Sequence, residues 1–203
     1  MKTYCLHHTD VPDRKKRLTN VFKRESIEVE WIEDFHPNSI SLQDLDIRHN
    51  LNINAISVYL KHKKCLELQK QNNYKNILVF EDDILIPENF QFNNFLEKCM
   101  VEFEQIKGDL LFIGGAFHHA PSEIKKDQLV YSEPGFISRC AHAYVVSHRC
   151  LDHLLENIDI IDDALDWKIN NIIKEKNLKV CYTEPHLKQS TVEGLEASTI
   201  QDN

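Results

Sequence analysis

The stretch ILVFEDDILIP, residues 77–87, places three consecutive carboxylates between two apolar runs. Burying an unpaired carboxylate is costly, and adjacent carboxylates repel each other. A continuous apolar run such as 77–80 is typical of a central parallel strand that is covered on both faces. Glu81, Asp82 and Asp83 thus follow directly on a buried strand, where a metal ion, an arginine or water at the strand edge must compensate their charge.

Alternation of strand and helix patterns along the rest of the chain predicts an α/β fold. We expect one domain over residues 1–203, with a mostly parallel central sheet and helices on both faces. Thr9 or Asp10 is the expected cap of the first helix, which has proline in its first turn. The expected strands are 3–6, 28–32, 77–80, 110–113, 143–146 and 179–182. Two helices are expected to start near Pro12 and Pro87, and three more are expected over 53–71, 148–156 and 162–175. Residues 185–203 are expected to be loop-like.

The composition is ordinary for a soluble globular protein, with 42% hydrophobic and 28% charged residues in a chain of 203. The net charge of −8 argues against nucleic-acid binding, which usually requires a basic face. No apolar run approaches the length of a membrane span, and the first residues lack a signal-peptide core. The six cysteines form no Cys-x-x-Cys pair, so we expect buried, reduced thiols and a cytoplasmic location.

The acidic triplet has the composition of a site for a hard cation. In open α/β sheets, ligands collect at the carboxyl ends of the strands, which is where residues 77–80 deliver the triplet. An extended backbone points Glu81 and Asp83 to one side and Asp82 to the other. Mn²⁺ and Mg²⁺ prefer oxygen ligands, and one or two carboxylates with substrate phosphates complete their shell. The alternative is a solvated strand end, in which Asp83 caps a turn.

Glycine motifs do not explain the predicted sheet. The chain contains neither the P-loop pattern nor the Gly-x-Gly-x-x-Gly dinucleotide pattern. Gly114 and Gly115 follow the apolar segment 110–113 and would allow close approach of a ligand to the backbone. An ordinary turn from strand to loop is the alternative.

The chain resembles a known family in six segments. In order, these are DVPDRKKRL, LKHKKCLEL, ILVFEDDILIP, LLFIGG, CAHAYVVS and DALDWKIN, and they are similar to the blocks of glycosyltransferase family 25. That family includes lipooligosaccharide galactosyltransferases and the catalytic domains of collagen galactosyltransferases. The resemblance covers nearly the whole chain. It implies a GT-A (Rossmann-like) fold, a nucleotide-sugar donor that is usually a UDP-sugar, a metal ion of the Mn²⁺ type, and inversion at the anomeric carbon.

The resemblance also implies roles for individual residues. Asp83 matches the last acid of the family's Glu-Asp-Asp motif, which is the expected metal ligand. Glu81 and Asp82 match positions expected to hold the ribose or the donor sugar. Lys61 replaces the serine of the family's Leu-Ser-His block. The remaining donor-site expectations are Arg14 near the nucleotide, His62 of that block, His142 and Tyr144 of the block around the alanine and tyrosine, and the two glycines Gly114 and Gly115.

The catalytic base and a second metal ligand are assigned on weaker patterns. Asp166 matches the aspartate before the family's late helix and is our candidate for the general base. Asp163, three residues earlier and expected on the same helical face, is the alternative base. Both could also be ordinary acidic residues at a helix start. GT-A enzymes often add a late metal ligand, for which we name His186, with Gln189 as a competing polar contact.

The sequence therefore predicts a metal-dependent inverting glycosyltransferase. It would move galactose or glucose from a UDP-sugar to a hydroxyl of a glycan or protein acceptor, as in lipopolysaccharide biosynthesis. Two other classes stay open: a nucleotide-sugar binding protein without turnover, which the substitution at Lys61 would suit, and a metal-dependent phosphohydrolase or nucleotidyltransferase. The absence of a second acidic cluster at two-metal spacing argues against the last class.

Overall fold

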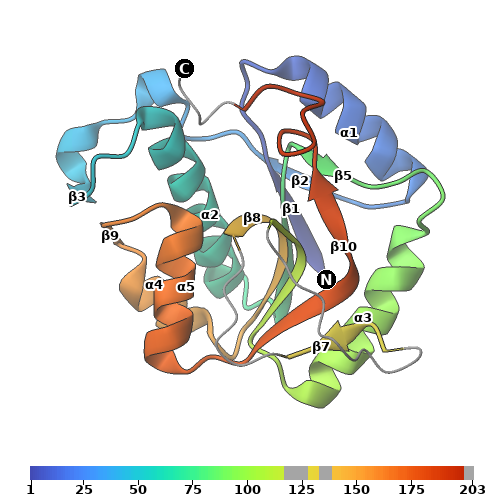
Figure 1. The fold of residues 1–203 in the computed structure, drawn as a ribbon. Helices are drawn as coiled ribbons and strands as arrows, with labels where there is room; N and C mark the ends of the chain where they lie inside the picture. Colours follow the sequence, from blue (N-terminus) through green and yellow to red (C-terminus); the bar gives the residue numbers. More distant parts are fainter. Residues whose placement is uncertain (117–127, 133–138, 199–203) are drawn as a thin grey trace.

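The computed structural model describes residues 1–116, 128–132 and 139–198. Figure 1 shows a twisted central sheet with helices on both sides. The strand order in that sheet is β2-β1-β4-β8-β6-β10-β5, and β7 pairs with β10. The strands are β1 (Lys2–Leu6), β2 (Glu30–Ile32), β4 (Asn76–Glu81), β5 (Ile84–Leu85), β6 (Leu110–Ala116), β7 (Val130–Tyr131), β8 (Arg139–Ser147) and β10 (Val180–Gln189), while β3 (Asp46–Ile47) and β9 (Ile160–Ile161) pair separately.

Most of the long strands share one direction. β2, β1 and β4 are parallel to one another, and β6 is parallel to β10. β8 lies between β4 and β6 and is antiparallel to both, so β4 and β6 also point the same way. The short strands β5 and β7 are antiparallel to β10. The predicted α/β architecture with a mostly parallel sheet is confirmed, although β4 has a parallel neighbour on one side only.

Side chains alternate between two cores along each strand, as the pleat requires. In β4, Ile77 and Val79 pack with α2 (Ile53–Gln71), α4 (Leu151–Asn157) and α5 (Leu165–Lys176). Leu78 and Phe80 pack on the opposite face with α1 (Pro12–Arg24) and α3 (Phe92–Ile106). Helices cover both faces of β4, so its residues are apolar from Ile77 to Phe80. The first charged residue, Glu81, lies at the carboxyl end of the strand.

The helix α1 begins at Pro12 as expected, but its predicted cap is wrong, and so is the predicted start of the next helix, α3. Val11 is the residue that precedes α1, and it makes no side-chain cap, so neither Thr9 nor Asp10 caps this helix. The chain after Pro87 does not continue as a helix; β5 comes first, and α3 begins only at Phe92. The strand β5 pairs antiparallel with β10. This pairing fixes the backbone that directly follows the acidic triplet.

The start of α5 also differs from the prediction. This helix begins at Leu165 rather than at 162, and Ala164 precedes it. Asp163 therefore lies outside the helix, and the expectation that it shares a helical face with Asp166 is wrong. Asp163 instead accepts a hydrogen bond from the backbone N–H of Ala164 at 2.8 Å, a local turn contact.

The last strand is longer than predicted. β10 continues through Leu187 to Gln189, with a shift in its pairing to β6 after Tyr182, so residues 185–189 are not loop-like. The reason is that Leu187 is buried and pairs with Gly114 of β6. Residues 190–198 then turn back toward α1 and the acidic triplet, which brings this late segment into the candidate site. The remainder of the predicted loop, 199–203, lies outside the described residues.

All six cysteines are free, as expected, and all but Cys140 are buried. Within the part of the chain that the structure describes, no helix is both long and apolar enough to cross a membrane.

Candidate functional site

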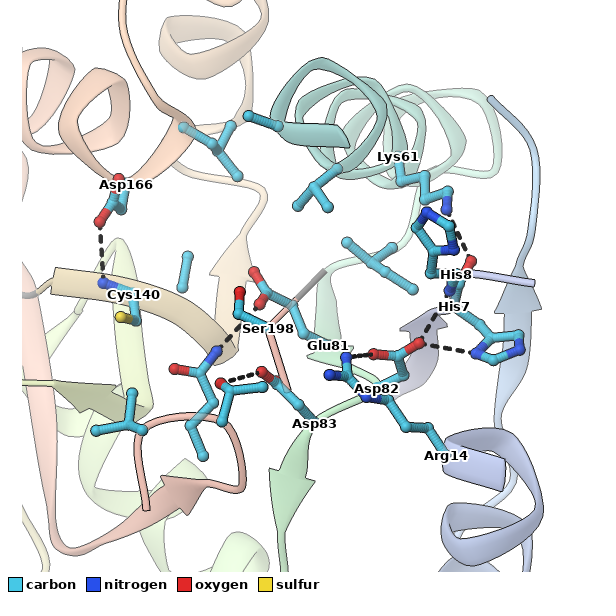
Figure 2. Close-up of a pocket in the computed structure, with 18 of the residues that line it drawn as sticks. His7, His8, Arg14, Lys61, Glu81, Asp82, Asp83, Cys140, Asp166 and Ser198 are labelled. Carbon is cyan, nitrogen blue, oxygen red and sulfur yellow. Dashed lines mark hydrogen bonds and ion pairs between the residues drawn. The ribbon is translucent and has the colours of Figure 1, made fainter. Parts of the chain in front are cut away.

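A cavity of about 520 Å³ opens at the carboxyl ends of β1 and β4. This size is within the range of small-molecule sites. Figure 2 shows Asp166 and Cys140 on one side of the cavity and Lys61, His7 and His8 on the other, with the acidic triplet between them. The lining includes Gln189, the polar contact that competes with His186, and five residues expected at the site, namely Arg14, Glu81, Asp82, Asp83 and Asp166.

Asp82 is a fully paired carboxylate. Its Oδ1 accepts a hydrogen bond from Arg14 Nη1 at 2.9 Å, and its Oδ2 accepts from the backbone N–H of His8 at 2.9 Å and contacts His7 Nδ1 at 2.8 Å. Burial would raise the pKa of Asp82, but these hydrogen bonds together outweigh burial and lower it. Asp82 therefore ties α1 to the end of β1 and is compensated within the protein.

Glu81 and Asp83 lie on the other side of the backbone, as the alternation predicted. Glu81 Oε1 lies 3.0 Å from His62 Nε2, and Glu81 Oε2 accepts a weak hydrogen bond from Gln189 Nε2 at 3.4 Å. Asp83 Oδ2 accepts a hydrogen bond from Thr191 Oγ1 at 2.7 Å. The other oxygen, Asp83 Oδ1, is buried and has no hydrogen-bond partner among the described residues.

The electrostatics of this pair are unfavourable in the absence of a cation. The pKa of Glu81 is raised to about 8, mainly by burial and then by the charges of Asp82 and Asp166. Burial also raises the pKa of Asp83 to about 7, with Glu81 as the next largest cause. Two carboxyl groups that are partly protonated near neutral pH mark a surplus of negative charge at one wall of the cavity.

A divalent cation fits this wall. Asp83 Oδ1 is a buried oxygen without a partner, and a hard cation prefers such an oxygen. The described residues contain no group of three or more His, Cys, Asp or Glu side chains placed to hold a metal ion. The described residues can therefore supply only part of a coordination shell, and a ligand such as a diphosphate could supply the rest.

His62 and Tyr144 stand behind the triplet and do not line the cavity. His62 Nδ1 lies 2.8 Å from the Tyr144 hydroxyl, and both side chains are buried. Burial lowers the pKa of His62 to about 3, so the imidazole is neutral. The chain of contacts from Tyr144 through His62 to Glu81 fixes the position of the Glu81 carboxyl. These two predicted donor-site residues are thus placed to orient an acid.

The predicted residues His142, Gly114 and Gly115 also lie outside the cavity lining. His142 Nε2 contacts the carbonyl of Leu187 at 3.1 Å, across the sheet from β8 to β10. A Cβ atom at Gly114 would lie 2.4 Å from His142 Nε2, which is closer than atoms can approach. Gly114 is therefore required for packing of the histidine between strands.

His186 and Asp163 are also absent from the cavity lining. His186 Nδ1 lies 3.9 Å from Glu184 on the same strand. Asp166, in contrast, lines the cavity from the first turn of α5. Its Oδ2 accepts from the backbone N–H of Cys140 at 3.0 Å, and its Oδ1 accepts from that of Trp167 at 2.9 Å. These bonds hold the carboxylate rigidly while leaving lone pairs on both oxygens.

The late segment 190–198 packs directly on the site. Arg14 Nη2 donates to the carbonyl of Ala197, and Arg14 Nε lies 3.4 Å from the Glu196 carboxylate. Arg17 also pairs with Glu196, at 3.1 Å, and donates to the backbone carbonyls of Asp82 and Ile84. The arginines of α1 thus clamp the chain on both sides of Asp83.

Sequence reasoning missed several residues of the cavity. His7 and His8 directly follow β1, so the rule that ligands collect at the carboxyl ends of parallel strands could have found them. Thr191 and Cys140 had no such signal. Thr191 reaches the cavity because β10 extends further than its sequence pattern indicated. Cys140 lies at the start of β8, and because β8 is antiparallel to β4, its first residues lie beside the carboxyl end of β4.

The comparisons with known proteins are weak. No protein-family model matches the sequence, and no curated protein matches it either. Among solved structures, the chain is similar to apo UDP-glucose pyrophosphorylase, with 10% identity and a TM-score of 0.42 over 96% of this chain and 78% of that one. It is also similar to a nucleoside-diphosphate-sugar pyrophosphorylase from Vibrio cholerae, with 13% identity and a TM-score of 0.37 over 90% and 72% of the two chains. Likenesses of this strength carry no argument about activity.

Proposed function

We propose that the protein is a metal-dependent inverting glycosyltransferase that transfers a hexose, galactose or glucose, from a UDP-sugar to an acceptor hydroxyl. The GT-A fold and membership of glycosyltransferase family 25 that the sequence blocks imply are part of this proposal. One observation carries it: Asp82 is compensated within the protein, whereas Glu81 and Asp83 face a cavity as a surplus of negative charge.

The division of roles in the triplet suits a nucleotide-diphosphate donor. Asp83 would hold Mn²⁺ or Mg²⁺ through the oxygen that lacks a partner. When bound, the metal neutralises charge on the diphosphate leaving group. Asp82 holds the Arg14 guanidinium beside the proposed metal position. From there, Arg14 can bind an anionic part of the donor. Glu81, oriented by His62, is placed to accept hydrogen bonds from hydroxyl groups of the ribose or sugar.

The proton from the acceptor hydroxyl needs a base on the other side of the donor, because inversion requires attack opposite the leaving group. Asp166 lies across the cavity from Arg14 and Asp82 (Figure 2) and is held by two backbone N–H groups. We assign it as the general base. Its carboxylate would take the proton as the oxygen attacks the anomeric carbon and UDP departs.

The test of this function is a donor screen followed by two base variants. UDP-, GDP- and CMP-sugars with Mn²⁺ are compared by thermal shift, because a ligand that binds the folded state raises its stability. We expect a UDP-hexose to give the largest shift and to be consumed with release of UDP. Release of pyrophosphate or inorganic phosphate from nucleotides without a sugar donor would instead identify a nucleotidyltransferase or phosphohydrolase.

The base is tested by comparing Asp166→Asn with Asp163→Asn. Asparagine keeps the shape of the side chain and removes its proton affinity. Asp166→Asn should lower kcat by ~10²–10⁴-fold with nearly normal donor affinity, which is the usual effect of losing a general base. Asp163→Asn serves as the control, because Asp163 lies outside the cavity lining. Equal and small effects of both substitutions would exclude Asp166 as the base.

A further inference from the structure

Lys61 is a buried cation at the wall of the cavity, and none of the roles proposed above involves it. It belongs to α2, its side chain is 2% exposed, and it lines the cavity opposite Asp166 (Figure 2). Its Nζ donates a hydrogen bond of 2.7 Å to the carbonyl of His7 at the end of β1. An ammonium group carries three donor hydrogens, so this bond uses one of them.

The charge of Lys61 has no direct counter-ion among the described residues. Among the residues that the structure describes, no carboxylate oxygen lies within 4.0 Å of Lys61 Nζ. The carboxylate that attracts it most is Asp82, which is already paired with Arg14 and His7. Buried charges in proteins are normally paired, because an isolated charge in a low-dielectric interior is costly. Burial accordingly lowers the pKa of Lys61.

On the side that faces the cavity, Lys61 is flanked by Arg14, His8 and Asp82, and the carboxylate of Asp82 is already paired with Arg14 and His7. Arg14 lies on the same wall, where its Nη1 and Nη2 donate to Asp82 and to the carbonyl of Ala197. Burial lowers the pKa of His8, and the charge of Lys61 lowers it further, so its neutral form is favoured. Leu6, Ala55 and Val58 supply the apolar part of this wall. An anion that entered here would meet the free donors of Lys61 in a desolvated setting.

We propose that Lys61 binds an oxyanion of the substrate, either a phosphate or a carboxylate group, and thereby selects an anionic ligand for this side of the cavity. The proposal deepens the proposed function, since the donor there is a UDP-sugar, but oxyanion binding by Lys61 does not depend on transfer of the sugar. If the donor's diphosphate supplies the oxyanion, Lys61 contributes to every UDP-sugar. If a carboxylate on the sugar supplies it, Lys61 makes the enzyme specific for a uronic acid donor, which would then replace galactose or glucose in the proposed function.

The alternative role for Lys61 is structural, as a brace between α2 and the end of β1. The two roles predict opposite effects on stability. Lys61→Met keeps most of the aliphatic stem but removes the buried charge together with its hydrogen bond. A residue kept for ligand binding costs stability in the free protein, so the Tm of Lys61→Met without ligand should equal or exceed that of the wild type. A brace predicts a clearly lower Tm.

The binding experiment uses isothermal titration calorimetry on the wild type, Lys61→Met and Lys64→Met. Lys64 is the matched control: it lies one turn further along α2, pairs with Asp34 at 2.5 Å, and does not line the cavity, so its loss changes the net charge equally. The ligands are inorganic pyrophosphate, UDP, UDP-glucose and UDP-glucuronate, each with Mn²⁺. We expect Lys61→Met to weaken at least one of them by roughly 10–100-fold, as loss of a charge-assisted hydrogen bond does, and Lys64→Met to leave all four unchanged.

The pattern of losses identifies the source of the oxyanion. Weaker binding of pyrophosphate, UDP and both sugars by Lys61→Met means that Lys61 binds a phosphate. Weaker binding of UDP-glucuronate alone means that it binds a carboxylate. Equal binding of all four ligands by Lys61→Met and wild type, or a large loss of Tm without ligand, overturns the proposal. Lys61-dependent binding of pyrophosphate in a protein that transfers no sugar would support this inference while the proposed function fails.

Discussion

Asp83→Asn should make the metal-free protein more stable at alkaline pH. Asp83 carries the buried oxygen without a partner, and its pKa is raised from an ordinary 3.8 to about 7, mainly by burial and then by the charge of Glu81. A group whose folded-state pKa is raised stabilises the fold fully below its unfolded-state pKa, and this stabilisation is lost as pH rises through the folded-state pKa. The wild type should therefore lose stability between about pH 4 and pH 8, and asparagine removes this loss.

The size of the effect follows from the pKa. Each pKa unit corresponds to about 1.4 kcal/mol, so the change from 3.8 to about 7 corresponds to roughly 4 kcal/mol of unfolding free energy. Relief of Glu81, whose own pKa is raised to about 8, adds to it in the same direction. Loss of the charge-assisted bond from Thr191 Oγ1 subtracts about 1.5–3 kcal/mol. We expect a net gain on the order of 1–3 kcal/mol for Asp83→Asn at about pH 8.

The assay is urea unfolding in the presence of EDTA, at about pH 5 and about pH 8, followed by tryptophan fluorescence. The quantity of interest is the difference in unfolding free energy between variant and wild type at each pH, which cancels the titration of groups that do not interact with Asp83. Asp152→Asn is the control, because Asp152 is exposed and pairs only at the surface with Lys70. A variant that is less stable than the wild type at pH 8, or a difference that does not change with pH, would refute the reasoning that this carboxylate is uncompensated.

Three further predictions concern the frame of the site. Asp82→Asn removes one partner of a buried ion pair and should cost about 3–5 kcal/mol, seen as a Tm lower by several degrees; an unchanged Tm would mean that Arg14 is not held by Asp82. Gly114→Ala places a Cβ against His142 and should lower the Tm; a Tm equal to that of the wild type would contradict the packing role. In the native protein without reductant, Cys140 should react fastest with a thiol reagent, and all six thiols should react in denaturant; oxidised pairs in the fresh protein would contradict the free-thiol assignment.

Much of the fold was predictable because its signals are local. The apolar run of β4, the span of α2 and the alternating cores could be read from the order of residues alone. The errors occur where tertiary contacts override the local pattern. α3 starts late because β5 first pairs with β10, and β10 extends because Leu187 packs against β6.

The site was predictable to a smaller extent. The alternation of Glu81 and Asp83 against Asp82 follows from strand geometry, and the structure has this arrangement. The pairing of Asp82 with Arg14 and His7 could not be predicted, because these residues are more than sixty positions away along the chain. The burial of Lys61 was equally invisible, since a lysine on a helix is usually exposed. Long-range contacts thus decide which charges of a motif remain available to a ligand.

The most direct test of the central claim is the Mn²⁺ dependence of UDP-sugar binding by the wild type and by Asp83→Asn. In calorimetry at about pH 8, the wild type should bind the donor with Mn²⁺ and much more weakly with EDTA, and Asp83→Asn should bind it weakly in both conditions while remaining folded. The pH matters because metal must compete with protons at a carboxyl whose pKa is about 7. Donor binding by Asp83→Asn as tight as that of the wild type, or wild-type binding that EDTA leaves intact, would contradict the account and make the acidic triplet a structural feature.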